Sequence, residues 1–295
     1  MNEETRHDAS TLVENQLDCH LRELERLTKA DLLVFDGDLL GKSDDIIRDA
    51  VEGRKRRRRK LVVILETNGG YAEVAERIAR TFRKHYSIVE FIVPNSAMSA
   101  GTILVMSGDA IHMDYYSVLG PIDPQVEKND SNNPIPVNGY LKQYEQLVEK
   151  ANEKNVTTAE LTLLIEKFDA GELYRYQQEM NLSVTLLKQW LVKYKFKTWK
   201  RTKTRHLKVT TQMKMKRAEA IAKTLNDSDE WHVHSRGIPM AVLRKRLKLV
   251  IEDFEKNKPL REELRRYTKL LNDYMMKSRC AGAIHTIGNF TSLWR

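Results

Sequence analysis

This 295-residue chain has few cysteines, no long apolar run and no apolar segment at its start. Its two cysteines, Cys19 and Cys280, provide no framework of disulfide bonds. The longest apolar run, residues 61–65, falls far short of the roughly 18–20 residues that a membrane-spanning helix needs. The first residues are polar and acidic, which does not fit a secretory signal. We therefore expect a soluble, cytoplasmic protein without a transmembrane segment.

Motifs for common cofactors and metals are also missing. The sequence has neither the G-x-G-x-x-G pattern of dinucleotide-binding folds nor the G-x-x-x-x-G-K-[ST] pattern of phosphate-binding loops. His232 and His234 have a spacing that puts both on one face of an extended segment, but no third metal ligand accompanies them. We interpret these two residues, and His112 within a predicted strand, as structural. No cofactor and no metal are expected.

Positive charge is concentrated in two segments, although the net charge of the chain is +9. Residues 54–60 (RKRRRRK) are all basic, and residues 188–217 contain twelve basic residues and no acidic one. The second segment also holds aromatic side chains, at Trp190, Tyr194, Phe196 and Trp199. These segments could bind nucleic acid, an anionic membrane surface or an acidic partner. A solvated loop and a solvated helix face are the alternative interpretation.

Short apolar segments alternate with helical patterns in the first half of the chain. Strands are predicted at residues 31–36, 60–66, 87–93 and 110–113. Helices are predicted between them, at residues 46–52, 71–85 and 99–107. This alternation predicts repeated βαβ units and a parallel sheet, hence an α/β fold.

The rest of the chain is expected to be helical. An amphipathic helix over residues 10–28 precedes the sheet, and a polar loop over 127–136 follows it. Further helices are predicted at residues 139–155, from 157 onward, and at 182–194, 211–225, 240–256 and 259–277. We therefore expect three parts: an N-terminal helix in residues 1–28, a sheet-containing core in 29–138, and an α-helical region in 139–295.

Two turns follow successive predicted strands. One contains Gly69 and Gly70, and the other places Ser99 among small neighbours at the start of a helix. Ligands of open α/β sheets bind at the carboxyl ends of parallel strands, where both turns are expected to lie. Backbone N–H groups at glycines and at a helix start can stabilise an oxyanion beside a serine nucleophile. A tight turn and an N-cap serine are the alternatives.

Several segments resemble the serine dehydrogenase proteinase family, relatives of signal peptide peptidase A with the Clp peptidase and crotonase fold. The resemblance lies in PNSAMSAGT (94–102), SGDAIHM (107–113), LGPIDPQ (119–125), KYKFKTWK (193–200) and WHVHSRGIP (231–239). It implies a parallel-sheet core built from ββα-type superhelical repeats. It also implies an ATP-independent serine peptidase that cleaves peptide or protein substrates and forms a homo-oligomer.

The same resemblance assigns roles to single residues. Ser99 is the expected nucleophile, and the N–H groups of Gly69 or Gly70 and of Ala100 form the expected oxyanion hole. No histidine stands where Clp peptidases carry their base, so a lysine base is the expectation, as in signal peptide peptidase A.

Lys142 is the nearest match to that lysine by position, with Lys150 behind it. A lysine acts as a base only when its surroundings favour the neutral form, and the neighbouring aromatic residues permit partial burial. Asp123 is a candidate orienting residue, or a turn former.

Two other functions remain open from the sequence. A crotonase-type enzyme acting on acyl-thioesters would use the same oxyanion hole, with carboxylates as acid and base. A non-catalytic scaffold would bind nucleic acid through residues 54–60 and 188–217.

Overall fold

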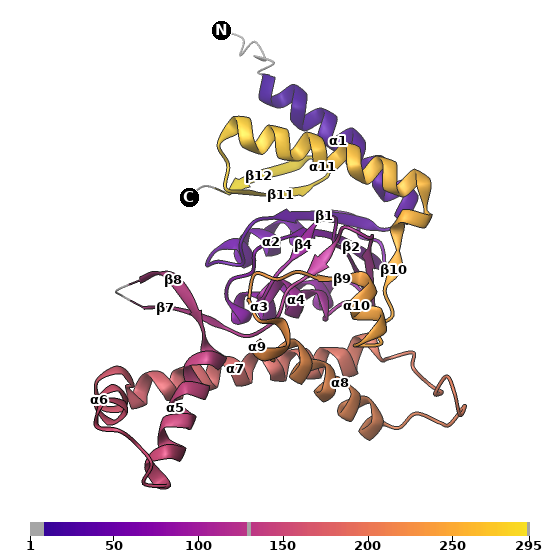
Figure 1. Cartoon of the computed structure of the whole chain (residues 1–295). Helices are drawn as coiled ribbons and strands as arrows, with labels where there is room; N and C mark the ends of the chain where they lie inside the picture. Colours follow the sequence, from indigo (N-terminus) through magenta and orange to yellow (C-terminus); the bar gives the residue numbers. More distant parts are fainter. Residues whose placement is uncertain (1–8, 129–130, 294–295) are drawn as a thin grey trace. The chain divides into compact units, whose positions relative to one another are not determined.

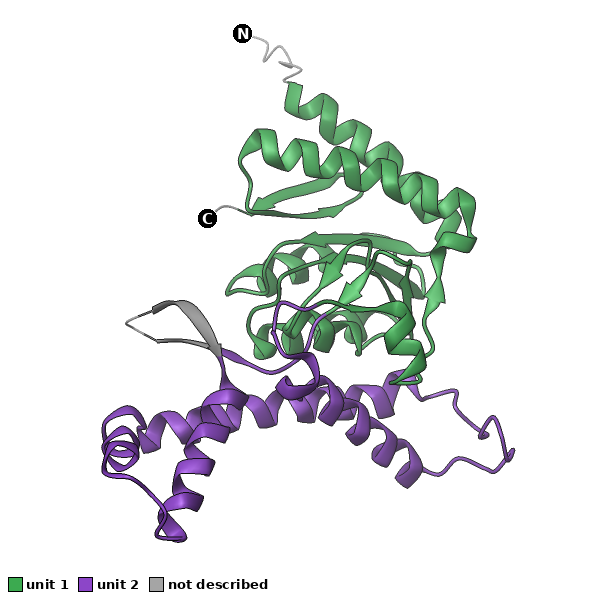
Figure 2. Ribbon diagram, viewed as in Figure 1, with its two compact units in different colours: residues 1–119, 237–295 green, residues 120–236 purple. Residues whose placement is uncertain are grey.

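The computed structural model describes residues 9–128 and 131–293. The chain divides into two compact units, which Figure 2 colours separately. Unit 1 contains residues 1–119 and 237–295, and unit 2 contains residues 120–236. Residues 237–295 belong to unit 1 because strands near the C-terminus join the sheet of that unit.

A seven-stranded sheet forms the centre of unit 1, in the order β10-β5-β3-β2-β1-β11-β12. Its parallel strands confirm the expected α/β fold, with a helix following each of the first three (Figure 1). The strands are β1 (Asp31–Asp36), β2 (Lys60–Glu66), β3 (Ile88–Ile92) and β5 (Ala110–Met113). The helices that follow them are α2 (Ser43–Glu52), α3 (Ala72–His85) and α4 (Ala100–Val105).

Helices cover the sheet on both faces (Figure 1). Helix α1 (Ala9–Thr28) packs on α11 (Lys258–Ser278), and both contact a core that includes Val34 and Val62. Helices α2, α3 and α4 lie on the other face. Residues 61–65 are therefore all buried, as expected for a parallel strand covered on both sides.

The C-terminal segment corrects the expectation of an all-helical region after residue 139. Strand β11 (Gly282–Thr286) pairs antiparallel with β1, and β12 (Asn289–Leu293) pairs with β11. The predicted helix 240–256 is also interrupted. It becomes α10 (Met240–Lys245), strand β10 (Glu252–Asp253) and the 3₁₀ helix η2 (Phe254–Lys256). Pairing of β10 with β5 favours an extended backbone there.

A second, three-stranded sheet lies beside the carboxyl ends of the main strands. It consists of β4 (Ser96–Ala97), β6 (Val118–Leu119) and β9 (Ile238–Pro239). β6 runs parallel to β4, and β9 runs antiparallel to β6. The chain therefore leaves unit 1 just after β6 and re-enters it just before β9.

Unit 2 is mostly helical, as expected. Its helices are α5 (Val137–Asn152), α6 (Thr158–Lys167), α7 (Ala170–Trp190), the π-helix η1 (Leu191–Lys195), α8 (Thr211–Leu225) and α9 (Ser228–Trp231). The expectation of a loop over residues 127–136 is wrong for the described residues, because β7 (Gln125–Lys128) and β8 (Ser131–Pro136) pair antiparallel. Residues 129 and 130 lie outside the described ranges. None of the helices in the described ranges combines the length and hydrophobicity needed to cross a bilayer.

Candidate active site

Backbone hydrogen bonds hold the two turns singled out in the sequence side by side. The N–H of Thr67 donates to the carbonyl of Ser96 (3.1 Å), and the N–H of Met98 donates to the carbonyl of Thr67 (3.0 Å). Ser99 follows Met98 directly, and Gly69 lies two residues after Thr67. The turn after β2 and the turn after β4 therefore meet, as their positions in the parallel sheet predict.

Ser99 has a strained backbone conformation. Its φ is 50° and its ψ is −118°, values that glycine usually adopts at the first central position of a type II′ turn. The Gly101 N–H closes this turn by donating to the Met98 carbonyl (2.7 Å). Ser99 is the N-cap residue of helix α4 by position, but its side chain makes no capping hydrogen bond to that helix. Strain of this kind, about 1–3 kcal/mol, is concentrated at active sites.

Close packing explains why glycines surround Ser99. A β-carbon at Gly69 would lie 2.7 Å from the Ser99 β-carbon, and the φ of Gly69 is +110°. A β-carbon at Gly70, whose φ is +133°, would lie 2.4 Å from the Leu39 carbonyl oxygen. A β-carbon at Gly101 would lie 2.3 Å from the Cγ2 of Thr67. Any side chain at these positions would push the turns apart.

The backbone N–H groups of the two turns are not equivalent. The Gly69 N–H donates to the Thr67 hydroxyl (3.0 Å), and the Gly69 carbonyl accepts from the Leu39 N–H (2.6 Å). Within the part of the chain that the structure describes, the N–H groups of Gly70 and Ala100 donate no hydrogen bond to protein. Ala100 is the first residue of helix α4, whose N-terminal end favours negative charge.

The candidate base and the candidate orienting residue both belong to unit 2. Lys142, on α5, forms ion pairs with Asp229 and, at 4.0 Å, with Asp227. Its side chain is 42% exposed, so the burial expected from its neighbours is only partial. Asp123 is 1% exposed and its Oδ1 lies 2.9 Å from Nδ1 of His234.

His234 forms a contact with Asp123 that the sequence did not predict. Its side chain is 12% exposed and hydrogen-bonded to the buried Asp123 carboxylate. A carboxylate that fixes the ring of a histidine is the arrangement that serine hydrolases use to orient a base. The WHVHSRGIP segment was visible in the sequence, but Asp123 lies 111 positions earlier, so no local spacing could reveal the pair.

The remaining candidate histidines do not assemble a metal site. His112, on β5, contacts Glu90 (3.0 Å) on the neighbouring strand, in keeping with a structural role. His232 is exposed, with φ at +66°. Among the described residues, no group of three or more His, Cys, Asp or Glu side chains could hold a metal ion.

A cavity of about 710 Å³ opens in unit 1 next to the glycine turn. Its wall includes Asn68 and Ser96, together with Asp36 and Glu66, which are register neighbours at the ends of β1 and β2. Burial, and the charges of Glu66 and Asp38, raise the pKa of Asp36 to about 7. The Glu66 carboxylate accepts from the Asn95 amide (2.6 Å).

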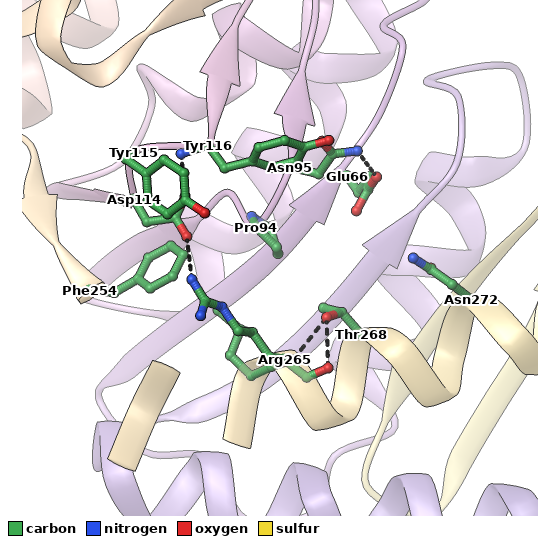
Figure 3. Close-up of a pocket in the computed structure, with 11 residues that line it drawn as sticks. Glu66, Pro94, Asn95, Asp114, Tyr115, Tyr116, Phe254, Arg265, Thr268 and Asn272 are labelled. Carbon is green, nitrogen blue, oxygen red and sulfur yellow. Dashed lines mark hydrogen bonds and ion pairs between the residues drawn. The ribbon is translucent and has the colours of Figure 1, made fainter. Parts of the chain in front are cut away.

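A second cavity, of about 400 Å³, is also lined by Glu66 and Asn95 (Figure 3). Asp114 and Arg265 form an ion pair at its wall (3.4 Å), and Tyr115 and Tyr116 line it while remaining largely exposed. Both cavities therefore lie at the carboxyl ends of the parallel strands, where α/β folds bind ligands.

Comparison with known proteins identifies the segment that carries this geometry. Residues 39–170 match the ClpP-like SDH-type serine proteinase family. The expected resemblance is thus confirmed over that segment, which contains both turns and Asp123. The family is one of serine proteinases, which agrees with the α/β fold and with a serine at the strained turn.

Curated relatives and solved structures give further similarities. Two uncharacterized proteins of Methanocaldococcus jannaschii, MJ1495 and MJ0137, are 30% and 34% identical over 100 residues, or 34% of this chain. These residues make up 32% and 33% of the relatives, so the chain spans about a third of their length.

Two solved structures of the 1510-N membrane-bound stomatin-specific protease are also similar. A serine-to-alanine mutant has 12% identity and a TM-score of 0.45, covering 76% of this chain and 79% of that one. A lysine-to-alanine mutant in complex with a substrate peptide has 13% identity and the same TM-score, covering 88% and 85%.

Proposed function

We propose that this chain is a serine peptidase that cleaves peptide bonds without ATP, through an acyl-enzyme on Ser99. The observation that carries the proposal is the strained Ser99 turn packed against Gly69. A sharp strand-to-helix turn exposes a serine hydroxyl and directs a helix N-terminus at the same point. The match of this segment to a serine proteinase family supports the same chemistry.

Gly70 and Ala100 are the proposed oxyanion donors. Their N–H groups make no hydrogen bond to the described residues, whereas the N–H of Gly69 already donates to the Thr67 hydroxyl. An N–H that is engaged elsewhere cannot stabilise a developing oxyanion at full strength. Gly69 is therefore assigned a packing role. Of the two glycines that the sequence offered as oxyanion donors, Gly70 is the one we propose.

The general base is proposed to be His234, oriented by Asp123. The Asp123–His234 hydrogen bond would fix one tautomer of the ring and leave Nε2 to take the serine proton. The positions of both residues along the chain support this assignment. Asp123 comes four residues after β6, and His234 comes four residues before β9. Those strands belong to the small sheet whose β4 leads to Ser99. Lys142, ion-paired to Asp229, is the alternative base.

A fluorophosphonate probe tests the proposed function, because it reacts covalently with activated serines. Wild-type protein should be labelled on Ser99 and should hydrolyse an unstructured peptide mixture, while Ser99→Ala should do neither. Ser107→Ala is the matched control, since it removes a buried hydroxyl without a hydrogen-bond partner elsewhere in unit 1. Light scattering on the same samples tests the proposed homo-oligomer.

A second candidate function follows from the carboxyl pair in the larger cavity. Asp36 and Glu66 are register neighbours, and the raised pKa of Asp36 suits a proton-transfer residue near neutral pH. An acyl-thioester enzyme would use such a pair beside the same oxyanion donors. Turnover of a short acyl-coenzyme A that is abolished by Asp36→Asn and retained in Ser99→Ala would favour this candidate over the peptidase.

A further inference from the structure

The basic segment between α7 and α8 has an ordered backbone. Residues 200–209, which we term the basic hairpin, contain a bridge between Arg201 and Lys208. The N–H of Thr202 donates to the Leu207 carbonyl (3.0 Å), and the N–H of Val209 donates to the Lys200 carbonyl (3.0 Å). Figure 1 shows this segment as the loop that joins the end of α7 to α8. Its cations therefore project from a defined scaffold.

The positive charge of the basic hairpin is not neutralised within the described part of the chain. Lys200, Lys203, Arg205 and Lys208 are exposed, and no ion pair joins any of them to a carboxylate there. Elsewhere in residues 188–217, Lys188 forms an ion pair with Glu219, on α8. Clustered, unpaired cations raise the local concentration of a polyanion.

Apolar side chains accompany these cations. Leu207 is 55% exposed within the hairpin, and Met215 is 55% exposed on the first turns of α8. At the base of the hairpin, Phe196 and Trp199 pack edge to face with ring centroids 5.6 Å apart. Both rings are partly buried, so they do not form the open stacking platform that single-stranded nucleic acid needs.

We propose that the basic hairpin binds the anionic lipid headgroups of a membrane surface, with Leu207 inserted at the headgroup boundary. Exposed cations beside an exposed leucine match an interfacial lipid contact, in which charge attracts and an apolar side chain is buried. This inference does not depend on the proposed peptidase activity, because lipid binding is measured in Ser99→Ala as well as in the wild type.

Vesicle sedimentation of the full chain tests this proposal. Wild-type protein should bind vesicles that contain phosphatidylserine and not vesicles of phosphatidylcholine alone, and binding should weaken in about 0.5 M salt. The triple variant Lys203→Gln, Arg205→Gln, Lys208→Gln should bind roughly 100-fold more weakly, since each cation near an anionic surface contributes about fivefold. Leu207→Ser should weaken vesicle binding. It should also lower the fraction of binding that remains at high salt.

The basic loop at residues 54–60 provides a control of equal charge. Lys55, Arg56 and Arg59 are exposed and make no ion pair with a described residue. The variant Lys55→Gln, Arg56→Gln, Arg59→Gln should retain lipid binding within about twofold of wild type. Equal loss in both triple variants would mean that net charge alone acts, and would overturn the proposal. Binding to oligothymidylate but not to phosphatidylserine vesicles would overturn it in favour of nucleic acid.

Discussion

Gly69 lies so close to Ser99 that a β-carbon on the glycine would come within 2.7 Å of the β-carbon of the serine. This contact joins the turn after β2 to the turn after β4. It requires glycine at position 69, because any other residue there would be strained. The proposed nucleophile and the proposed oxyanion donors are thus held at strand ends rather than on a long loop.

Replacing Gly69 with alanine should disable the site without unfolding the protein. The added β-carbon would clash with Ser99 and would also stand at a φ of +110°, so we expect a loss of stability of about 1–3 kcal/mol. Labelling of Ser99 by a fluorophosphonate should fall at least about tenfold.

Gly288→Ala is the matched control for that variant. Gly288 also has a positive φ, +74°, but a β-carbon there would meet no atom within 4 Å. It should cost about 1 kcal/mol and leave labelling unchanged. Equal labelling in both variants would show that the Gly69–Ser99 contact does not position the nucleophile.

The two assignments of the base predict opposite results for a pair of variants. If His234 is the base, His234→Gln should lower kcat by about 10²–10⁴ and Lys142→Gln should leave kcat close to wild type. If Lys142 is the base, the order is reversed. Asp123→Asn should resemble His234→Gln, because it weakens the hydrogen bond that orients the ring. Peptide hydrolysis by each purified variant, with circular dichroism to verify folding, decides between the two.

Ionisation of Asp36 should destabilise the protein as pH rises. The folded-state pKa is raised from 3.8 to about 7, so this group stabilises the fold fully below pH 3.8 and loses that contribution as pH rises to about 7. Asp36→Asn should therefore gain stability relative to wild type at pH 8, on the order of 2 kcal/mol. Urea denaturation of both proteins at pH 4 and pH 8 measures this difference. An equal effect of the substitution at pH 4 and pH 8 would contradict the assignment.

Acidification should weaken the contact between α1, α11 and the C-terminal strands. His285 is 1% exposed, lies 2.8 Å from the Tyr267 hydroxyl and bonds to Asp18 at 3.0 Å. Burial lowers the pKa of His285 below 6.5, so the stabilising contribution is present above pH 6.5 and is lost as pH falls through the folded-state value. Tyr267→Phe should cost about 1–2 kcal/mol at pH 7.5 in urea denaturation. If Tyr267→Phe were as stable as wild type, the Tyr267–His285 hydrogen bond would not contribute to stability.

The central strands were predictable because their signal is local. Residues 61–65 are apolar without interruption, and a parallel strand covered by helices on both faces requires such a run. The glycine pair and the small residues around Ser99 likewise mark tight turns within a few positions. These features depend on short-range sterics and burial, which can be predicted from the residue types within a few positions.

The missed features depend on contacts between distant parts of the chain. Strand β11 was not predicted, since its extended backbone is stabilised by pairing with β1, about 250 residues earlier. The Asp123–His234 pair spans 111 positions, and the strain at Ser99 arises from the turn geometry rather than from its residue type. Tertiary contacts of this kind leave no periodic pattern in the sequence.

The most direct test of the proposed peptidase is covalent labelling followed by peptide mapping. Wild-type protein is treated with a fluorophosphonate, digested and analysed by mass spectrometry, with Ser99→Ala and Ser107→Ala treated in parallel. The proposal predicts one modified site, Ser99, with labelling retained in Ser107→Ala and parallel loss of labelling and peptide hydrolysis in Ser99→Ala. Peptide hydrolysis by Ser99→Ala at the wild-type rate, or labelling at a different serine, would contradict it.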